Sequence, residues 1–540
     1  MIKSLKDLLD KFSRFTNSLV YDGGICKRLI KIDFFVMDEI YKIQDDISRK
    51  QIFTHCLYRL SKMKSDFYLI GPYFNGFSEE FKEKTNSKFE KYSTEIVKKD
   101  VVDISLIPIN SEYSLFGENL KKYSGKEVNL KHILTSFLEQ TLIYAKQVRT
   151  VESLARKFAE SRNIEDNENG LIDYIEESVN KNWSLIECLK KKVAFHHGKI
   201  PRYIQVEIVE MFNKGEIDFL FCTSTLIEGV NTSAKNVVIY DTLKGSDEVL
   251  TGFDIKNIQG RAGRFLRHFI GNVVIMEPSE APAEKDIIEF SYYDKKELEN
   301  DEILQIDQND LNEKSLDKYK EIEKFLSSNN IPISIIKRNK FIDIFKQIQF
   351  INFLRSNKDF LQSLYFENNI PEKVQLEKIL ECLHEYIFNN QDKFDKAFPL
   401  FRLKHLTKYY VYKNPQIKEI IAEQEGKKVD TKVRNAFKLI SHYFEFALPK
   451  YLTVFENLYN FVSKDKISLK FLIMKLEFGF TENHEILLKD IGIPYNIIRK
   501  ISEKFADCKT LEDLKLKYFF VEQKLEILPY EKEIIKKYLS

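Results

Sequence analysis

Two arginines are the residues whose type and spacing most directly suggest chemistry. Arg261 and Arg264 are separated only by an alanine and a glycine within Asn257–Arg264. Small neighbours allow both guanidinium groups to reach one compact anion, and the planar arginine fork holds phosphate oxygens in a fixed geometry while it stays charged. The spacing therefore predicts a phosphate-binding turn. The alternative is a pair of solvated surface charges.

Two neighbouring carboxylates form a second candidate group. Asp38 and Glu39 follow the apolar run Phe34–Met37, a pattern typical of a strand. An aspartate at the end of a strand can hold Mg²⁺ through water, and the next carboxylate can polarise an attacking water molecule. The alternative is a strand followed by a solvated acidic turn.

Hydroxyl groups follow a third apolar run. Phe219–Cys222 predicts a buried parallel strand, and Thr223 and Thr225 come directly after it. Ligands of open α/β sheets bind at the carboxyl ends of the strands. Hydroxyls and loop amides at such an end are suitable donors to nucleic-acid phosphates, whereas the alternative is a helix cap followed by a glycine turn.

These phrases occur in an order that resembles superfamily 2 helicases, most closely the Ski-like, DExH-type branch. Phe219–Asn231 is similar to motif V, and Asn257–Arg264 is similar to motif VI. Residues 195–215 resemble the segment before motif V, and Ile30–Tyr41 resembles motif II, the Walker B line. Several ordered matches are far more specific than any single one. The resemblance therefore predicts the fold and the activity of these helicases.

The resemblance also implies where the cofactors ATP and Mg²⁺ bind. Asp38 and Glu39 would form one wall of a cleft between two lobes, with Mg²⁺ held by Asp38 through water. Arg261 and Arg264 would reach the γ-phosphate from the other wall, as arginine fingers do in related phosphoryl-transfer enzymes. Further nucleotide contacts implied by the resemblance are Gly229, Asn231 and Asn257, and contacts to DNA or RNA are Thr223, Thr225, His197 and Arg202. For His197 the resemblance also allows a contact between motifs.

Two features depart from the family pattern. Gly71-Pro72-Tyr73 stands where motif III usually carries Ser-Ala-Thr, so none of the coupling residues of that motif is transferred to this chain. No Gly-x-x-x-x-Gly-Lys-Ser/Thr loop, whose backbone amides cradle phosphates, occurs in the sequence. In the family that loop lies well upstream of motif II, whereas Asp38 lies close to Met1. We therefore expect a truncated first lobe, in a fragment or a split subunit.

The missing loop predicts a partner. A separate polypeptide that carries the N-terminal ATPase half would supply it, and the chain alone would show little ATPase activity. The Gly71–Tyr73 turn and the long helical tail also resemble bacterial antiphage-defence helicases, which makes a nuclease or another defence subunit a candidate partner. The predicted function is the C-terminal part of an ATP-dependent helicase or translocase. The alternative is a non-catalytic nucleic-acid-binding or assembly subunit that retains the fold.

Composition narrows the class of protein and its compartment. The 540 residues are too many for one core, and 84 basic against 82 acidic side chains give a net charge of only +2. Any nucleic-acid surface must therefore be a local groove. The 6 cysteines form no CxxC pair, and His196 and His197 lack further ligands at zinc spacing, so a reducing cytoplasm without disulfides or zinc is expected. No signal peptide or membrane span is predicted.

The expected fold class is α/β RecA-like lobes, each a parallel sheet with flanking helices, followed by an all-α C-terminal region. The predicted divisions are a truncated first lobe (1–110), a connector (111–135), a second lobe with motifs IV–VI (136–280), an acidic linker (281–318) and a helical C-terminal domain (319–540). An amphipathic helix is predicted at 1–20. Aromatic residues and lysines interleave in the last division, as in Lys404–Lys413. The simpler interpretation is a helix core with solvated lysines, and the alternative is a surface that grips single strands.

Overall fold

The computed structural model describes residues 32–41, 43, 47–63, 65–72, 74–92, 97–227, 232, 234–245, 248–263, 268–278, 287–290, 292–293, 298–340, 342–367, 370–388 and 399–539. The helix predicted at 1–20 lies outside these residues. The chain forms two compact units, each assembled from three stretches of sequence. Unit 1 consists of Met1–Ser93, Glu284–Asp395 and Lys450–Leu469, and unit 2 of Thr94–Ala283, Lys396–Pro449 and Lys470–Ser540. None of the described helices is long and apolar enough to span a lipid bilayer.

Unit 2 is built on a six-stranded sheet in which all neighbouring strands are parallel. In spatial order the strands are β4 (Lys98–Asp103), β13 (Ile270–Ile275), β10 (Asn236–Ile239), β7 (Thr141–Tyr144), β9 (Phe219–Cys222) and β8 (Val193–His196). Every residue of β7, β8, β9 and β10 is buried. Such continuous apolar strands are typical of parallel sheets covered on both faces. The buried strand predicted at Phe219–Cys222 is confirmed.

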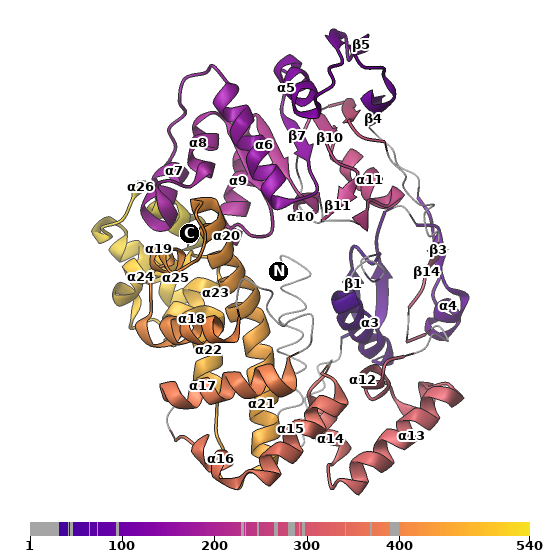
Figure 1. The fold of residues 1–540 in the computed structure, drawn as a ribbon, viewed down its shortest axis with the longest axis vertical. Helices are drawn as coiled ribbons and strands as arrows, with labels where there is room; N and C mark the ends of the chain where they lie inside the picture. The colour runs from indigo at the N-terminus through magenta and orange to yellow at the C-terminus, as the bar shows by residue number, and fades with distance from the viewer. Residues whose placement is uncertain are drawn as a thin grey trace. The chain divides into compact units, whose positions relative to one another are not determined.

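Helices flank this sheet, as Figure 1 shows for the magenta part of the chain. α6 (Val148–Ser161) contacts β8 and β9, while α8 (Ser184–Lys190) and α9 (Arg202–Lys214) contact β8. α11 (Gly252–Gln259) contacts β10. Apolar side chains at helical spacing give α6 its buried face, and they are Val151, Leu154, Ala155 and Phe158. The predicted parallel sheet with flanking helices is confirmed.

The amino-terminal part of unit 2 differs from the predicted division of the chain. β4 lies within the range 1–110 assigned to the first lobe, yet it pairs with β13 along its whole length. The chain then forms a hairpin of β5 (Glu112–Leu115) and β6 (Glu118–Lys121), followed by α5 (Lys126–Ser136). Parallel strands pair across long crossover connections, so a local sequence pattern does not reveal which sheet an isolated strand joins.

Unit 1 contains a much smaller parallel sheet of two strands. β1 (Phe34–Met37) pairs with β2 (Asp66–Leu69), and α3 (Ile47–Lys62) lies between them in sequence. The strand predicted at Phe34–Met37 is confirmed. A second pair of short parallel strands joins β3 (Gly76–Phe77) to β14 (Ile287–Ile288), which brings together two distant parts of the chain.

Aromatic side chains form a core around α4 (Glu79–Thr85) in unit 1. Phe81 of α4 and Phe290 are fully buried with ring centroids 4.2 Å apart, and the ring of Tyr293 lies 5.1 Å from that of Phe81. Phe290 and Tyr293 belong to the range 281–318, which is predicted to be an acidic linker. That range instead contributes β14, α12 (Asn300–Ile303) and buried rings to unit 1. Its few large apolar side chains decide its packing, because burying them outweighs the local excess of charge.

The region 319–540 is helical, as predicted, and its helices divide between the two units. Those of unit 1 are α14 (Ile333–Arg338), α15 (Ile344–Ser356), α16 (Lys358–Ser363) and α17 (Lys373–Cys382), which follow α13 (Glu313–Ser328). Those of unit 2 are α18 (Leu400–Lys413), α19 (Ile417–Ala422), α20 (Val429–Lys438), α22 (Lys470–Phe478), α23 (Asn483–Asp490), α24 (Tyr495–Ile501), α25 (Leu511–Val521) and α26 (Pro529–Leu539). α21 (Leu448–Val462) crosses from one unit into the other at Lys450.

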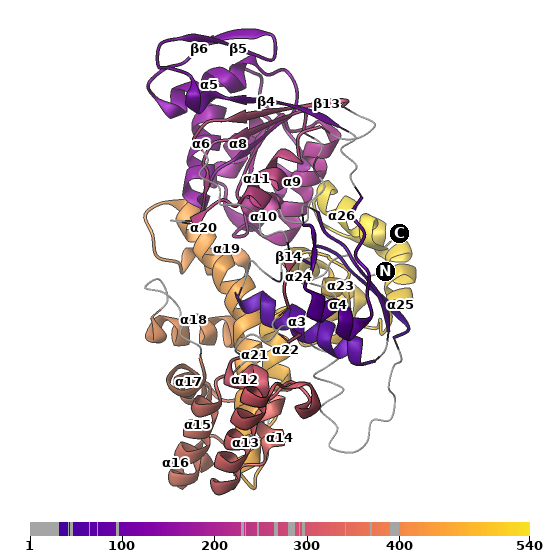
Figure 2. The ribbon, with the colours of Figure 1, turned by 90° about the vertical axis from the view of Figure 1, so that its right-hand side faces the viewer.

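Within unit 2 the helical region packs directly on the second lobe. α26 contacts α7 (Gly170–Ile175), and α19 contacts η2 (Glu176–Asn180). Tyr174 of α7 belongs to one buried apolar cluster with residues of the C-terminal helices, among them Ile498 and Ile535. Figures 1 and 2 show these helices, in orange and yellow, from two sides. The sheet of the lobe and its helical partner are therefore parts of one compact unit.

Candidate nucleic-acid and nucleotide site

The loops after β8 and β9 lie together at the carboxyl edge of the six-stranded sheet. Thr223 follows β9, and its backbone N–H donates to the carbonyl of His196 at the end of β8 at 3.3 Å. The hydroxyl oxygens of Thr223 and Thr225 are 3.0 Å apart. A Cβ built on Gly198, in the loop after β8, would lie 3.5 Å from Cγ2 of Thr225. Thr223 is buried and Thr225 is exposed, so of these two hydroxyls Thr225 is the one presented to solvent.

Both histidines that precede Gly198 are buried. His196 is 2% exposed and His197 is 1% exposed, and burial lowers the pKa of each imidazole to about 3. Nδ1 of His197 accepts a hydrogen bond from the backbone N–H of Lys199 at 3.2 Å, so its proton is on Nε2, which lies 3.1 Å from Oε1 of Glu152. This burial argues against the predicted contact between His197 and a nucleic-acid phosphate. We assign His197 instead to a buried polar network.

Glu152 of α6 is the centre of that network. Its Oε1 accepts from His197, and its Oε2 accepts from Nη1 of Arg434, which comes from α20 in the helical region. Burial raises the pKa of Glu152 to about 8, while the Arg434 guanidinium acts in the opposite direction. Since both carboxylate oxygens accept hydrogen bonds from N–H donors, the geometry suits the ionised form. Local sequence patterns gave no sign of this network, because Arg434 and Glu152 are 282 residues apart.

Arg202 occupies a different position from His197. It is the first residue of α9 and is exposed, with Pro201 at the cap position before it. The first amides of a helix lack carbonyl partners within the helix, and the helix dipole favours anions at this end. An exposed arginine at the start of α9 therefore fits the predicted contact with a phosphate backbone.

The motif VI segment begins in a well-capped helix. The Thr251 hydroxyl accepts from the N–H of Asp254, and the Asp254 carboxylate accepts from the N–H of Thr251, which fixes the start of α11. Asn257 near the end of α11 and Arg261 just beyond it are both partly exposed. Burial raises the pKa of the Cys222 thiol and the charge of Arg261 opposes that shift, which places the guanidinium near the end of β9.

The small residues between the arginines have a packing role. Ala262 is fully buried and forms a bridge with Ala234, and the N–H of Gly263 donates to the Ala234 carbonyl at 2.8 Å. Gly263 has φ of +74°, and a Cβ built on Gly271 of β13 would lie 2.4 Å from the carbonyl oxygen of Ala262. Backbone therefore lies directly on backbone here. The prediction explained these residues by access to an anion, whereas the structure shows that they let the turn pack against β13.

The two carboxylates lie at the end of β1 in unit 1. Asp38 is exposed, and its Oδ1 accepts a hydrogen bond from the N–H of Glu39 at 2.8 Å. Glu39 has φ of +55°, a conformation that costs of order 1–3 kcal/mol for a residue other than glycine and is often retained at functional sites. A Cβ built on Gly71 would lie 3.2 Å from Cδ1 of Tyr41. The Gly71-Pro72 turn at the motif III position therefore packs against the motif II turn.

The fit of Mg²⁺ to this turn depends on its ligands. Magnesium is commonly held by one or two carboxylates, with water and substrate phosphates completing its coordination. The exposed carboxylate of Asp38 suits that arrangement. Among the residues that the structure describes, no group of three or more His, Cys, Asp or Glu side chains could hold a metal ion. A cation at Asp38 would therefore need phosphate oxygens and water as its other ligands.

The structure describes some of the predicted site residues and not others. Gly229, Asn231 and Arg264 lie outside the described residues. Thr223, Thr225 and the loop that begins at His197 lie at one edge of the sheet of unit 2. Asp38 and Glu39 belong to unit 1 and Arg261 belongs to unit 2, so their meeting around one nucleotide stays a prediction.

A charged cluster that sequence patterns missed lies at the same edge of the sheet. Nζ of Lys126 is 2.9 Å from Oδ1 of Asp241 and 4.1 Å from the ring centroid of Tyr240. The other oxygen of Asp241 accepts from the N–H of Lys146 at 3.0 Å. These contacts tie the start of α5 and the segment after β7 to the end of β10. Because the buried Asp241 carboxylate is engaged through both oxygens, we assign it a structural role.

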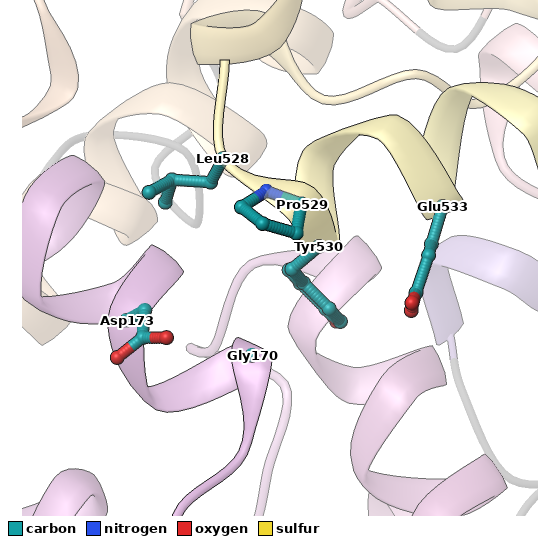
Figure 3. Close-up of a pocket in the computed structure, with 6 residues that line it drawn as sticks. All are labelled: Gly170, Asp173, Leu528, Pro529, Tyr530 and Glu533. Atoms are coloured by element: carbon teal, nitrogen blue, oxygen red, sulfur yellow. The ribbon is translucent and has the colours of Figure 1, made fainter.

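A pocket of about 280 Å³ lies at the junction of the second lobe and the helical region (Figure 3). It is lined by Gly170, Asp173, Leu528, Pro529, Tyr530 and Glu533. The charged groups of this lining are the carboxylates of Asp173 and Glu533, which would repel a phosphate. The pocket therefore does not suit a nucleotide or nucleic acid.

This chain is similar to a known protein family over part of its length and to a known protein over most of it. Residues 125–268 match the family described as "Helicase conserved C-terminal domain". The chain is also 26% identical over 516 residues to "Anti-bacteriophage protein B" of Escherichia coli (strain K12), a match that covers 90% of this chain and 68% of that protein. The first resemblance covers the sheet from β7 to the motif VI turn, and the second extends over almost the whole chain.

Other similar proteins match over shorter stretches. "ATP-dependent DNA helicase Hel308" of Pyrococcus horikoshii is 35% identical over 105 residues, which are 19% of this chain and 15% of that helicase. Among solved structures, the "DUF1998 helicase MrfA bound to DNA" has a TM-score of 0.32 and 13% identity, and the match covers 46% of this chain and 30% of that one.

Proposed function

We propose that this chain belongs to the superfamily 2 DExH-type helicases and is part of an ATP-dependent nucleic-acid helicase or translocase. The observation that carries the proposal is the arrangement at the carboxyl edge of the six-stranded sheet. There the exposed Thr225 lies beside the loop after β8, and α9, with Arg202 at its exposed start, follows that loop. Hydroxyls, helix-start amides and arginine are the donors that proteins use to hold a nucleic-acid backbone.

The nucleotide part of the proposal gives each predicted residue a role. Asp38 would hold Mg²⁺ through water and Glu39 would orient the attacking water molecule. Arg261 and Arg264 would stabilise the charge that develops on the γ-phosphate. Gly229, Asn231 and Asn257 would contact the nucleotide from the second lobe. A Gly-Lys-Ser/Thr phosphate loop, which this sequence does not contain, must come from another polypeptide segment.

Reconstitution of ATPase activity tests the nucleotide part. We expect the chain alone to hydrolyse ATP at close to background rate, and we expect a polypeptide that carries the phosphate loop to restore nucleic-acid-stimulated hydrolysis. Arg264→Ala should then abolish the restored rate. Arg156→Ala is the matched control, because Arg156 is an exposed arginine of α6 in the same unit. Strong hydrolysis by the chain alone would overturn the need for a second polypeptide.

Binding measurements test the nucleic-acid part. Fluorescence anisotropy with labelled single-stranded DNA and RNA of the same sequence would show which of the two the chain prefers. Arg202→Ala should weaken binding similarly for all sequences and reduce the slope of log K against log salt by about one unit. Equal binding by the wild-type chain and by an Arg202→Ala, Thr225→Ala double variant would contradict the placement of the nucleic acid.

We also propose a role in antiphage defence, because the Escherichia coli protein that matches 90% of this chain is called an anti-bacteriophage protein. A nuclease or another defence subunit is then the expected partner, and the cytoplasm is the expected compartment. The five cysteines that the structure describes are buried and unpaired, as a reducing compartment allows. Phage plating on cells with the wild-type protein and with Arg264→Ala tests this role, and equal protection by both would contradict an ATP-dependent one.

A second function is a non-catalytic nucleic-acid-binding or assembly subunit. The Gly71-Pro72-Tyr73 turn in place of motif III and the absence of a phosphate loop from the sequence favour it. Under this alternative, Glu39→Gln and Arg264→Ala would leave nucleic-acid binding and phage protection unchanged, and no added polypeptide would restore hydrolysis.

A further inference from the structure

Arg434 is among the side chains of the helical region that contact the second lobe. Arg434 of α20 is 8% exposed, and its Nη1 donates to Oε2 of Glu152 on α6. Its Nη2 donates to the hydroxyl of Thr431 at 3.0 Å, which fixes the orientation of the guanidinium group. Glu152 is 6% exposed. A buried carboxylate and a buried guanidinium from separate parts of the chain are thus directly paired.

The chain of contacts continues from Glu152 to the loop after β8. Oε1 of Glu152 accepts from Nε2 of His197, and Nδ1 of His197 accepts from the backbone N–H of Lys199. The carbonyl of His197 accepts from the N–H of Ile200 at 3.1 Å, which closes a tight turn. The imidazole can make these two hydrogen bonds only in one tautomer and one ring orientation. Glu152 selects both, and the turn conformation follows from them.

The turn from His197 to Ile200 adjoins the hydroxyl that we place against nucleic acid. A Cβ built on Gly198 would lie in van der Waals contact with Thr225, at 3.5 Å from its Cγ2, and Gly198 and Lys199 are exposed at the edge of the sheet. A shift of the turn would therefore change the surroundings of Thr225 directly.

We propose that Arg434 is a positioning residue which, through Glu152 and His197, holds the turn His197–Ile200 against Thr225, so that the helical region sets how tightly the second lobe grips nucleic acid. This inference rests on the proposed function and adds a role for the helical region to it. A simple docking contact would also pair Arg434 with Glu152, but it would not require Glu152 to share its other oxygen with the histidine that shapes the turn.

Hydrogen exchange tests the positioning role without any nucleic acid. In Arg434→Met we expect faster amide exchange in peptides that cover residues 196–201 and 222–227, because Glu152 loses its partner and the imidazole loses its fixed acceptor. Arg434→Lys keeps a positive charge and should restore slow exchange in part. Lys537→Met is the matched control, since it removes another contact between the helical region and the lobe, with Glu207 and Glu210 of α9. Faster exchange confined to α20 and α6 would overturn the proposal.

Binding provides the second measurement. We expect Arg434→Met to weaken the affinity for a single-stranded oligonucleotide by about 2- to 30-fold, the usual range for a residue that acts through others. In a Thr225→Ala background the same change should have little further effect, because both residues act on one contact. Additive losses in the double variant would overturn the link to Thr225. If the wild-type chain binds no oligonucleotide, the proposed function fails, while the exchange experiment still decides whether Arg434 sets the turn.

A milder variant keeps the test valid if Arg434→Met does not fold. Glu152→Gln preserves the volume of the side chain and an oxygen that can accept from His197, but it removes the charge that pairs with Arg434. We expect it to raise exchange in the same two peptides and to weaken binding less than Arg434→Met. Unchanged exchange in both peptides would overturn the proposal.

Discussion

The two parallel sheets of this protein differ in how completely they are covered. In unit 2 the four strands β7 to β10 are buried at every position. In unit 1 the outer face of β1 and β2 carries large apolar side chains in contact with solvent, with Phe34 59% exposed and Tyr68 54% exposed. The opposite face is covered, since the ring of Phe67 packs against Phe81 of α4 at 6.1 Å. One sheet is thus a complete core and the other is covered on one face.

The difference concerns how stable a scaffold each group of predicted site residues has. Parallel strands are stable when both faces are covered, and a pair of strands alone is marginal. The sheet edge in unit 2 where we propose nucleic-acid binding has a self-sufficient scaffold. Asp38 and Glu39 extend from a pair of strands whose apolar outer face is exposed. This contrast agrees with our proposal that another polypeptide segment contributes to the ATPase site.

The largest expected effect is on ATP hydrolysis. In the reconstituted enzyme, Arg261→Ala should reduce ATP hydrolysis by about 10³–10⁵-fold, because an arginine that stabilises charge on the γ-phosphate is worth that much in related enzymes. Steady-state ATPase rates at saturating nucleic acid measure it. Nucleic-acid affinity without ATP should stay close to that of the wild type. A loss below tenfold would mean that Arg261 does not reach the phosphate.

Substitutions in the two sheets test how completely each sheet is covered. Phe221 of β9 is fully buried, so Phe221→Ala should lower the free energy of unfolding of unit 2 by about 3–5 kcal/mol. Phe34→Ala on the exposed face of β1 should change stability by about 0.5 kcal/mol or less. Urea unfolding, followed by circular dichroism, compares the two variants. A large loss for Phe34→Ala would show that the face of β1 is covered in solution.

Gly271 and Gly76 differ in how much space a Cβ would have at each position. Gly271→Ala would place a Cβ 2.4 Å from the carbonyl oxygen of Ala262, so we expect a loss of about 3 kcal/mol from forced displacement of the motif VI turn. Gly76→Ala in unit 1 is the control, since nothing lies within 4 Å of a Cβ built there. Thermal unfolding of both variants measures the difference. Equal melting temperatures would show that the turn does not pack on β13.

A smaller effect depends on pH. Burial lowers the pKa of His196 to about 3, against an ordinary value of 6.5, so the folded protein keeps this imidazole neutral while the unfolded chain gains a proton below pH 6.5. The stability it contributes is present above pH 6.5 and is lost as the pH falls toward 3. At pH 5.5 the loss relative to neutral pH is about 1.4 kcal/mol.

Urea unfolding at pH 7.5 and pH 5.5 measures that loss. His196→Asn should show a difference between the two pH values that is smaller than the wild-type difference by about 1.4 kcal/mol. His132→Asn, which changes an exposed ring in α5, is the control for the histidine-to-asparagine substitution itself. An unchanged pH dependence in His196→Asn would contradict a neutral buried imidazole.

Much of unit 2 was predictable because its signals are local. The apolar run Phe219–Cys222 is short, continuous and followed by hydroxyls, and it forms β9 with the expected bounds. The apolar periodicity of residues 148–160 likewise marks α6. In both cases the burial of one strand or of one helical face decides the structure. The buried residues lie close together in sequence, so a local pattern reveals them.

Other features were not predictable because their partners are far away in sequence. The imidazole of His197 is buried beside Glu152, which also pairs with Arg434, and nothing in Phe195–Gly198 reveals either residue. Similarly, β4 joins its sheet through β13, and Phe290 is buried against Phe81. Each of these depends on tertiary contacts that a local pattern does not encode.

The division of the chain has a consequence for dissecting the protein. The backbone passes from one unit to the other at residues 93/94, 283/284, 395/396, 449/450 and 469/470. A protease that nicks any one of these junctions yields two fragments, each of which holds segments that the other needs to complete a unit. Such a nicked protein should run as two bands on a denaturing gel and as one species in gel filtration. Neither unit corresponds to one continuous piece of a gene, so a single truncation removes part of a core, never a whole module.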